Sequence, residues 1–234
     1  MKILALESSA GVASVALCEN EKLLHLVQDH SGHTHSETLL PMVASALEKH
    51  GLCPHDIDLF ACSVGPGSYT GLRIGVATVK GLAFGTGKPC VPVSSLEALA
   101  QNCACFEGLI CPVMDARRDQ MYTAFFESKD QVLRRLTDDD LLPLSEIAAK
   151  VRKYGRRIRF VGDGYEKTVK ALHSDLTKDT PELLRHANAY SVALCAYRKY
   201  SLSPHENYDE SLLSPTYLRA VQAERERLER LSKA

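Results

Sequence analysis

Short apolar runs separated by turn residues open the chain, at residues 2–7, 12–18 and 22–28. Runs of this length with polar breaks predict an antiparallel meander of strands. After a polar stretch, apolar residues recur at helical spacing and predict a helix over 37–50. Thr34 and Glu37 have the spacing of a capping box at its start. Pro41 falls early in this helix, and we expect it to kink the helix or delay its start.

The following segments alternate between strand and helix. The sequence predicts, in order, a buried strand over 57–64, a glycine-rich loop over 65–71, a helix over 72–85, a strand over 90–93 and a short helix capped at 94–97. The order β-β-β-α-β-α-β-α suits a mixed sheet covered by helices.

From residue 106 the pattern restarts as a second, reduced lobe. Its predicted elements are strands over 109–114, 120–128 and 157–162, and helices over 145–154 and 188–200. We therefore expect an α/β protein with a first lobe over 1–105, a smaller lobe over 106–205, and a linker with a C-terminal helix over 206–234.

Composition narrows the classes of function. The 28 Lys and Arg residues nearly balance the 29 Asp and Glu residues, so the net charge is -1 and no overall field attracts polyanions. No run approaches the roughly 18 apolar residues of a membrane span, which favours a cytoplasmic protein without membrane contact. Eight cysteines are too sparse for a disulfide scaffold. Cys103, Cys105 and Cys111 lack a neighbouring histidine, so buried reduced thiols are favoured over zinc.

The helix over 72–85 carries a stripe of small residues beside its apolar stripe. An interior glycine costs about 1 kcal/mol relative to Ala, so close approach of another backbone is the expected compensation. The approaching helix belongs either to the 37–50 segment of the same chain or to another chain, and we favour another chain. The predicted contact residues are Leu39, Val43, Gly71, Gly75, Thr78 and Gly81.

Three further features leave alternatives open. The loop over 65–71 either holds an anion on the N–H groups of the following helix or is a tight turn. His30, His33 and His35, with Glu37, lack the spacing of a metal motif, and solvation is favoured over metal binding. A basic run either contacts RNA or forms a solvated surface. It consists of Lys150, Arg152, Lys153, Arg156, Arg157 and Arg159.

Several segments together resemble one protein family. They are residues 1–17 (MKILALESSAGVASVAL), 35–41 (HSETLLP), 65–83 (GPGSYTGLRIGVATVKGLA), 93–98 (VSSLEA), 114–122 (MDARRDQMY) and 215–219 (PTYLR). From residue 1 to about 220, the chain resembles the bacterial tRNA threonylcarbamoyladenosine-biosynthesis family TsaB, also called YeaZ-like.

This resemblance implies a fold, a role and partners. The fold is that of the two-lobed actin-like ATPases, which is ribonuclease H-like. The role is that of a non-catalytic subunit without a cofactor, paired with the related subunit TsaD, which transfers a threonylcarbamoyl group to the adenosine beside the anticodon of tRNA. The ATPase TsaE joins the pair, and tRNA is met only through the complex. Family members also form homodimers through first-lobe helices.

The resemblance also bears on catalysis. Catalytic members of the superfamily grip phosphates with Asp-x-Gly-Thr-type turns, whereas here the turn contains Glu7, Ser8 and Ser9, which implies a vestigial phosphate loop. The catalytic relative binds a metal through histidines four apart on a helix. His33 and His35 are two apart and cannot share a helical face, so no metal is expected. The alternative is a free-standing enzyme, either an actin-like phosphotransferase or a metallopeptidase built on the histidine loop.

Overall fold

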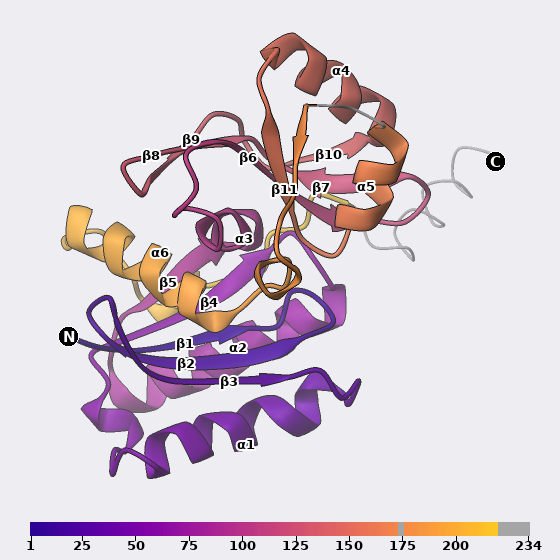
Figure 1. The fold of residues 1–234 in the computed structure, drawn as a ribbon. Coiled ribbons are helices and arrows are strands. Elements are labelled where there is room, and N and C mark those ends of the chain that lie inside the picture. The colour runs from indigo at the N-terminus through magenta and orange to yellow at the C-terminus, as the bar shows by residue number, and fades with distance from the viewer. Residues whose placement is uncertain (173–175, 220–234) are drawn as a thin grey trace, which may run out of the picture.

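A computed structural model describes residues 1–172 and 176–219. Figure 1 shows two sheets stacked one above the other, with helices below, between and above them. The first sheet has the spatial order β3 (Lys22–Asp29), β2 (Ala13–Glu19), β1 (Lys2–Glu7), β4 (Leu59–Gly65) and β5 (Cys90–Ser94). The strands β1, β2 and β3 are antiparallel neighbours, and β1, β4 and β5 are parallel, as the mixed-sheet prediction requires.

Both faces of this sheet are covered. Leu4 and Leu6 of β1 point to one face and pack with α1 (His35–Glu48) and α2 (Tyr69–Thr86). Ile3 and Ala5 point to the other face and pack with α6 (Ala189–Leu202). The alternation follows from the two-residue period of a strand. The predicted lobe ranges remain predictions, but α6 packs on the first sheet although its residues fall in the range that we expected for the second lobe.

The start of α1 bears out one expectation and corrects another. The Thr34 N–H donates to the Glu37 carboxylate at 3.3 Å, which is half of the predicted capping box. The helix begins at His35, so Pro41 lies inside it and does not delay its start. Within the described ranges 1–172 and 176–219, no helix has the length and apolar character needed to cross a membrane. The predicted C-terminal helix falls on residues 221–234, outside the described ranges.

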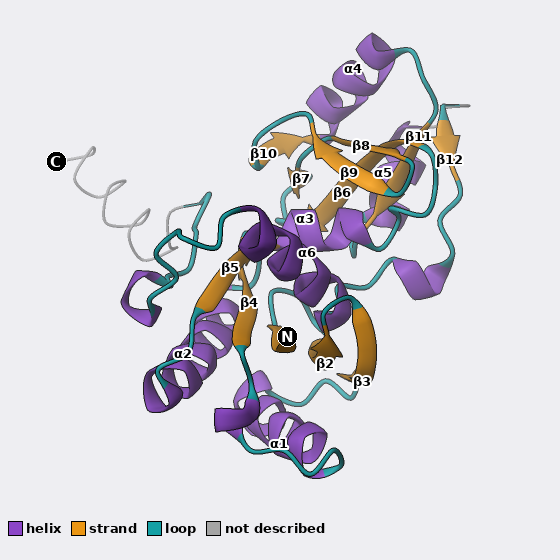
Figure 2. Cartoon of the chain, turned by 90° about the vertical axis from the view of Figure 1, so that its left-hand side faces the viewer, coloured by secondary structure: helices purple, strands orange, loops and turns teal. Residues whose placement is uncertain are grey.

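The second sheet is built around β6, as Figure 2 shows from another side. Helices α4 and α5 pack on its outer face, and α3 packs on its inner face, toward the first sheet. Short 3-10 helices lie at Pro54–Asp56, Glu182–Leu184 and Glu210–Leu212. The other elements are α3 (Ser95–Gln101), β6 (Gly108–Asp115), β7 (Gln120–Thr123), β8 (Phe126–Lys129), β9 (Val132–Arg135), β10 (Asp140–Pro143), α4 (Leu144–Tyr154), β11 (Ile158–Val161), α5 (Tyr165–Leu172) and β12 (Thr177–Lys178).

The prediction of one strand over 120–128 was wrong in detail. Strands β7 and β8 pair with β6 in one shared antiparallel register, but the ladder stops between them at Ala124 and Phe125. The register places Pro112 of β6 opposite Ala124, and proline has no N–H to donate to a ladder. Phe125 instead donates its N–H to the Thr137 hydroxyl at 3.0 Å. The sequence pattern also missed β9, β10, α5 and β12.

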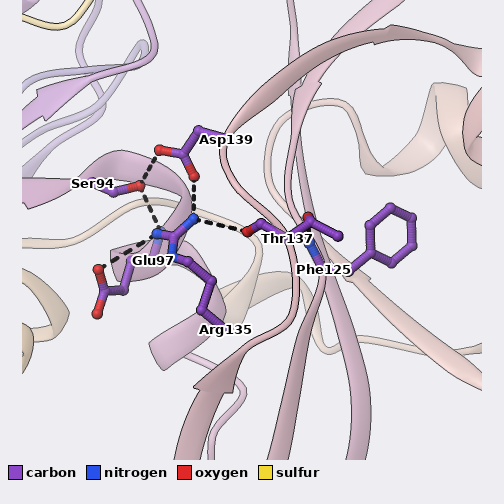
Figure 3. Close-up of polar contacts among 6 residues, drawn as sticks. All are labelled: Ser94, Glu97, Phe125, Arg135, Thr137 and Asp139. Atoms are coloured by element: carbon purple, nitrogen blue, oxygen red, sulfur yellow. Dashed lines mark hydrogen bonds and ion pairs between the residues drawn. The ribbon is translucent and has the colours of Figure 1, made fainter.

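A polar network ties the two lobes together, as Figure 3 shows. The Ser94 hydroxyl at the end of β5 donates to an Asp139 carboxylate oxygen at 2.6 Å. The other oxygen of Asp139 pairs with the Arg135 guanidinium at 2.5 Å, and Arg135 also lies 3.5 Å from Glu97 of α3. Because each of these groups is partly shielded from water, the network restrains how far the lobes can separate.

A second connection comes from residues 213–219, which we term the C-terminal strap. Its Thr216 N–H donates to the Val64 carbonyl of β4 at 2.7 Å. Further along, the Arg219 guanidinium donates to the Ala116 carbonyl beyond β6, also at 2.7 Å. The strap therefore runs from the first sheet to the turn between β6 and β7.

The first turn of α2 lies directly on the turn that follows β1. The Ser8 hydroxyl donates to the Gly71 carbonyl at 2.9 Å, and the Ser68 N–H donates to the Ser9 carbonyl at 2.7 Å. A Cβ at Gly71 would lie 2.1 Å from the Ser8 carbonyl oxygen, and one at Gly75 would lie 2.3 Å from the Ser8 hydroxyl. These two glycines of the small-residue stripe therefore admit a turn of the same chain rather than a second helix.

The other end of the stripe is open. A Cβ at Gly81 or at Gly85 would meet nothing within 4 Å among the described residues. The glycines at the start of the stripe make room for the turn after β1, whereas those at its end are uncovered. Only the uncovered end can contact another chain.

Alanine substitutions distinguish the two ends. We expect Gly71→Ala to lower the free energy of unfolding by about 2 kcal/mol or more, because the Ser8 carbonyl has no room to move away. Gly81→Ala is the matched control, and it should raise the same quantity by up to about 1 kcal/mol through helix propensity. Urea denaturation of the isolated chain measures both. Equal stability of the two variants would contradict the assignment of Gly71 to internal packing.

Candidate functional site

Glu7 lies at the end of β1 with no exposed surface. Its carboxyl accepts a hydrogen bond from the Ser9 N–H at 2.6 Å and a short one from the Ser63 hydroxyl. Burial raises the pKa of the Glu7 carboxyl above its ordinary value, and the hydrogen bonds from Ser63 and Ser9 oppose that rise. Burial therefore opposes ionisation of this carboxyl.

The rest of the predicted phosphate loop faces two directions. The Ser8 side chain points into the protein, toward α2. Ser9 lines a cleft of about 490 Å³ between the lobes, and its buried hydroxyl has no hydrogen-bond partner among the described residues. Of the three residues, only Ser9 is therefore placed to meet a molecule in the cleft.

The far wall of the cleft carries acids from the second lobe. The Asp115 N–H donates to the Asp163 carboxylate at 2.9 Å, and the Arg117 N–H donates to the Asp115 carboxylate at 2.7 Å. Desolvation in the cleft raises the pKa of Asp163, and the neighbouring Asp115 carboxylate acts in the same direction. Lys167 lies 3.5 Å from Asp115 and partly balances this charge. The carboxylates on this wall therefore disfavour a phosphate placed beside them.

The predicted interface residues are largely turned inward. Leu39 and Val43 are 1% and 2% exposed and belong to the core beneath α1. Gly71 and Gly75 are buried against Ser8. Thr78 is half-buried, with its hydroxyl bonded to the Ile74 carbonyl, and Gly81 is exposed. A partner of this chain can therefore reach the last two residues but not the first four.

Sequence reasoning missed the outward apolar residues of these helices. Leu40 of α1 is 56% exposed and Phe84 of α2 is 77% exposed. The helical periodicity identified the face that packs on the sheet, and single apolar residues on the opposite face give no periodic signal. We use the term α1/α2 face for the outward residues Leu40, Pro41, Ala44, Ala77, Thr78, Gly81, Phe84 and Gly85.

The cations of the basic run over 150–159 have different surroundings. Arg156 pairs with Glu127 at 2.8 Å, and the Arg159 guanidinium lies 3.9 Å from the centre of the Phe106 ring. Lys150 lines a small cavity beside the acidic residues 138–140. The exposed cations that remain are Arg152, Lys153 and Arg157.

The histidines are also dispersed. His35 Nε2 lies 2.8 Å from the Ala10 carbonyl oxygen, and His30 packs edge-on against His186 with ring centres 5.3 Å apart. Within residues 1–172 and 176–219, no three His, Cys, Asp or Glu side chains are grouped to hold a metal ion.

The cysteines that were considered as zinc ligands differ in exposure. Cys103 and Cys111 are buried, and burial raises the pKa of each thiol to about 12. Cys105, which we also expected to be buried, is exposed.

Comparison with known proteins gives consistent matches. The profile of the family described as "TsaD: tRNA N6-adenosine threonylcarbamoyltransferase" matches residues 27–227. The chain is 34% identical to the tRNA threonylcarbamoyladenosine biosynthesis protein TsaB of Bacillus subtilis over 76% of each chain. It is 36% identical to the protein of that name in Haemophilus influenzae over 52% of each chain. The solved structure of a YeaZ-like protein from Pseudomonas aeruginosa superposes with a TM-score of 0.77 at 26% identity, covering 93% of this chain and 99% of that one.

Replacement of Glu7 tests its protonation. A carboxyl with a raised pKa keeps its proton in the folded state and loses it on unfolding, so its contribution to stability falls as the pH rises above the unfolded value. Relative to the unmodified chain, we expect Glu7→Gln to gain stability as the pH rises above the pKa of an unfolded glutamate, by up to about 1.4 kcal/mol per pH unit. Urea denaturation across pH measures this difference. Glu19→Gln removes an exposed carboxylate and is the control, and a pH-independent loss in Glu7→Gln would disprove the assignment.

Proposed function

The chain belongs to the TsaB (YeaZ-like) family of the actin-like ATPase superfamily, and on this basis we propose that it is a non-catalytic scaffold for tRNA modification. Its partner is the catalytic subunit TsaD, which transfers a threonylcarbamoyl group to the adenosine beside the anticodon. The ATPase TsaE joins the pair, and tRNA is engaged through the complex. In the absence of TsaD, the chain pairs with a second copy of itself.

The α1/α2 face is the observation that carries this proposal. Phe84 and Leu40 hold large apolar side chains in water, beside glycines that leave the helix backbone uncovered. Fully burying a side chain of this size contributes about 1.5–3 kcal/mol. An apolar centre with open backbone beside it suits close packing of a foreign helix.

The relationship to TsaD supports the choice of partner. The TsaD profile covers most of this chain, so the two proteins are expected to present equivalent helix pairs on their first lobes. Two such faces can pack about an approximate two-fold axis, in which each helix pair contacts its counterpart. A homodimer would use the same face with a true two-fold axis.

The turn after β1 supports a non-catalytic role. A phosphotransferase would need a charged acid at Glu7, whose burial opposes ionisation. A metallopeptidase built on the histidine loop would need His33 and His35 as a pair, but His35 is engaged by the Ala10 carbonyl. These contacts favour the scaffold over the free-standing enzymes.

A charge placed on the α1/α2 face tests the docking. We expect Phe84→Asp to weaken co-purification with the catalytic subunit at least about tenfold, because an unpaired carboxylate would be buried at the centre of the contact. Formation of the modified adenosine in a mixture of all components should fall in parallel, while the melting temperature of the isolated chain changes little.

Leu202→Asp is the matched control. Leu202 is 85% exposed at the end of α6, on the opposite side of the first sheet, and its replacement should leave both assays unchanged. Equal effects of the two variants would contradict the proposed face. Turnover of ATP or peptide by the chain alone would contradict the scaffold role.

A further inference from the structure

Three segments that do not belong to the α1/α2 face meet at the mouth of the inter-lobe cleft. One is the start of α2, the second is the turn between β6 and β7, and the third is the C-terminal strap. Each segment belongs to a stretch on which the family resemblance rests. Together they contribute what we term the tyrosine–arginine rim, made of Tyr69, Arg73, Arg117, Arg118 and Tyr217.

The two tyrosines of the rim are stacked and open to solvent. Their ring centres are 5.1 Å apart with an angle of 35° between the planes, and the residues are 40% and 42% exposed. The Arg73 guanidinium lies 5.0 Å from the centre of the Tyr69 ring and donates to its hydroxyl. Pairs of exposed aromatic rings beside a guanidinium are the kind of surface on which unpaired bases stack.

Two of the rim cations come from the turn between β6 and β7. Arg117 and Arg118 are exposed in the turn after β6, where their φ angles of 64° and 53° are uncommon for residues other than glycine. The hydrogen bond from Arg219 to Ala116 helps to hold this turn in place. Asp115 and Asp163 line the same cleft as Arg117, and both are exposed. The exposed cations of the rim are placed to meet the phosphates of a nucleotide strand.

One polar group of the cleft is still unused. The Ser9 hydroxyl is buried against the cleft without a hydrogen-bond partner among the described residues. A base or ribose that enters from the rim would supply the missing partner, because each carries both donors and acceptors.

We propose that the tyrosine–arginine rim binds an unpaired nucleotide of an RNA strand. The base stacks on the tyrosine pair, and the flanking phosphates lie on Arg73, Arg117 and Arg118. A free nucleotide shares this chemistry, and competition with adenosine monophosphate distinguishes the two ligands. The choice of RNA rests on the proposed function, while the stacking and charge arguments rest on the rim itself.

The test measures binding of a labelled, unstructured oligoadenylate by fluorescence anisotropy across salt, using the full chain. We expect Tyr217→Ala to weaken binding about tenfold and Tyr217→Phe to preserve it, because stacking needs only the ring. The double variant Arg117→Gln, Arg118→Gln should reduce the slope of log affinity against log salt by about 1 to 2. Glutamine at these positions removes charge without adding backbone strain beyond that of arginine.

The controls separate this site from other surfaces. The double variant Arg152→Gln, Lys153→Gln removes exposed cations of the basic run and should leave binding unchanged. Adenosine monophosphate is the competitor that represents a free nucleotide. Competition at the affinity of the oligonucleotide would overturn an RNA site in favour of a nucleotide site. Equal losses in the two double variants would overturn the assignment to the rim.

A parallel assay uses tRNA with the complex of this chain and the catalytic subunit. Tyr217→Ala should raise the tRNA concentration needed for half-maximal modification while co-purification stays intact. Phe84→Asp should show the reverse pattern, so failure of the docking proposal and failure of the rim proposal give different results. If Tyr217→Ala changes neither the tRNA requirement nor the oligonucleotide affinity, the inference is wrong.

Discussion

The contact between the turn after β1 and the first turn of α2 determines where the rest of the first lobe can lie. The Ser9 carbonyl approaches the loop before α2, and the Ser8 carbonyl approaches its first turn, so closely that only glycine fits at Gly67 and Gly71. This contact fixes α2 against the end of β1, and α1 meets the same turn through His35. The positions of the two helices on the sheet are therefore fixed, and their outer faces lie side by side.

The same contact also determines which residues of the turn can reach the cleft. Since Ser8 and Glu7 are engaged inside the protein, the turn has little chemistry left for the cleft, and only Ser9 reaches it. The exposed features lie elsewhere, in the apolar residues of the α1/α2 face and in the aromatic and cationic residues of the rim. The network of Ser94, Asp139 and Arg135 keeps the two lobes that flank this rim at a set distance.

Sequence reasoning reached the fold but not the surfaces. Alternating runs and helical spacing located the first-lobe strands and helices. This works because buried residues such as Leu4 and Leu39 recur at the period of the strand or helix that carries them. The small-residue stripe could not be assigned, since a glycine looks identical whether it faces Ser8, as Gly71 does, or solvent, as Gly81 does. Phe84 was missed because a single exposed apolar residue leaves no periodic pattern. The pairing of Tyr69 with Tyr217 depends on a contact between distant segments, which no local pattern contains.

The position of α6 has a consequence for how the chain matures. The strands of the first sheet lie within residues 2–94, yet one of its faces is covered by Ala189–Leu202, which follow the whole second sheet in the chain. During translation, Ile3, Ala61 and Val91 would therefore remain without their apolar cover until α6 has been synthesised. Until then the uncovered apolar face of the sheet favours aggregation of the nascent chain.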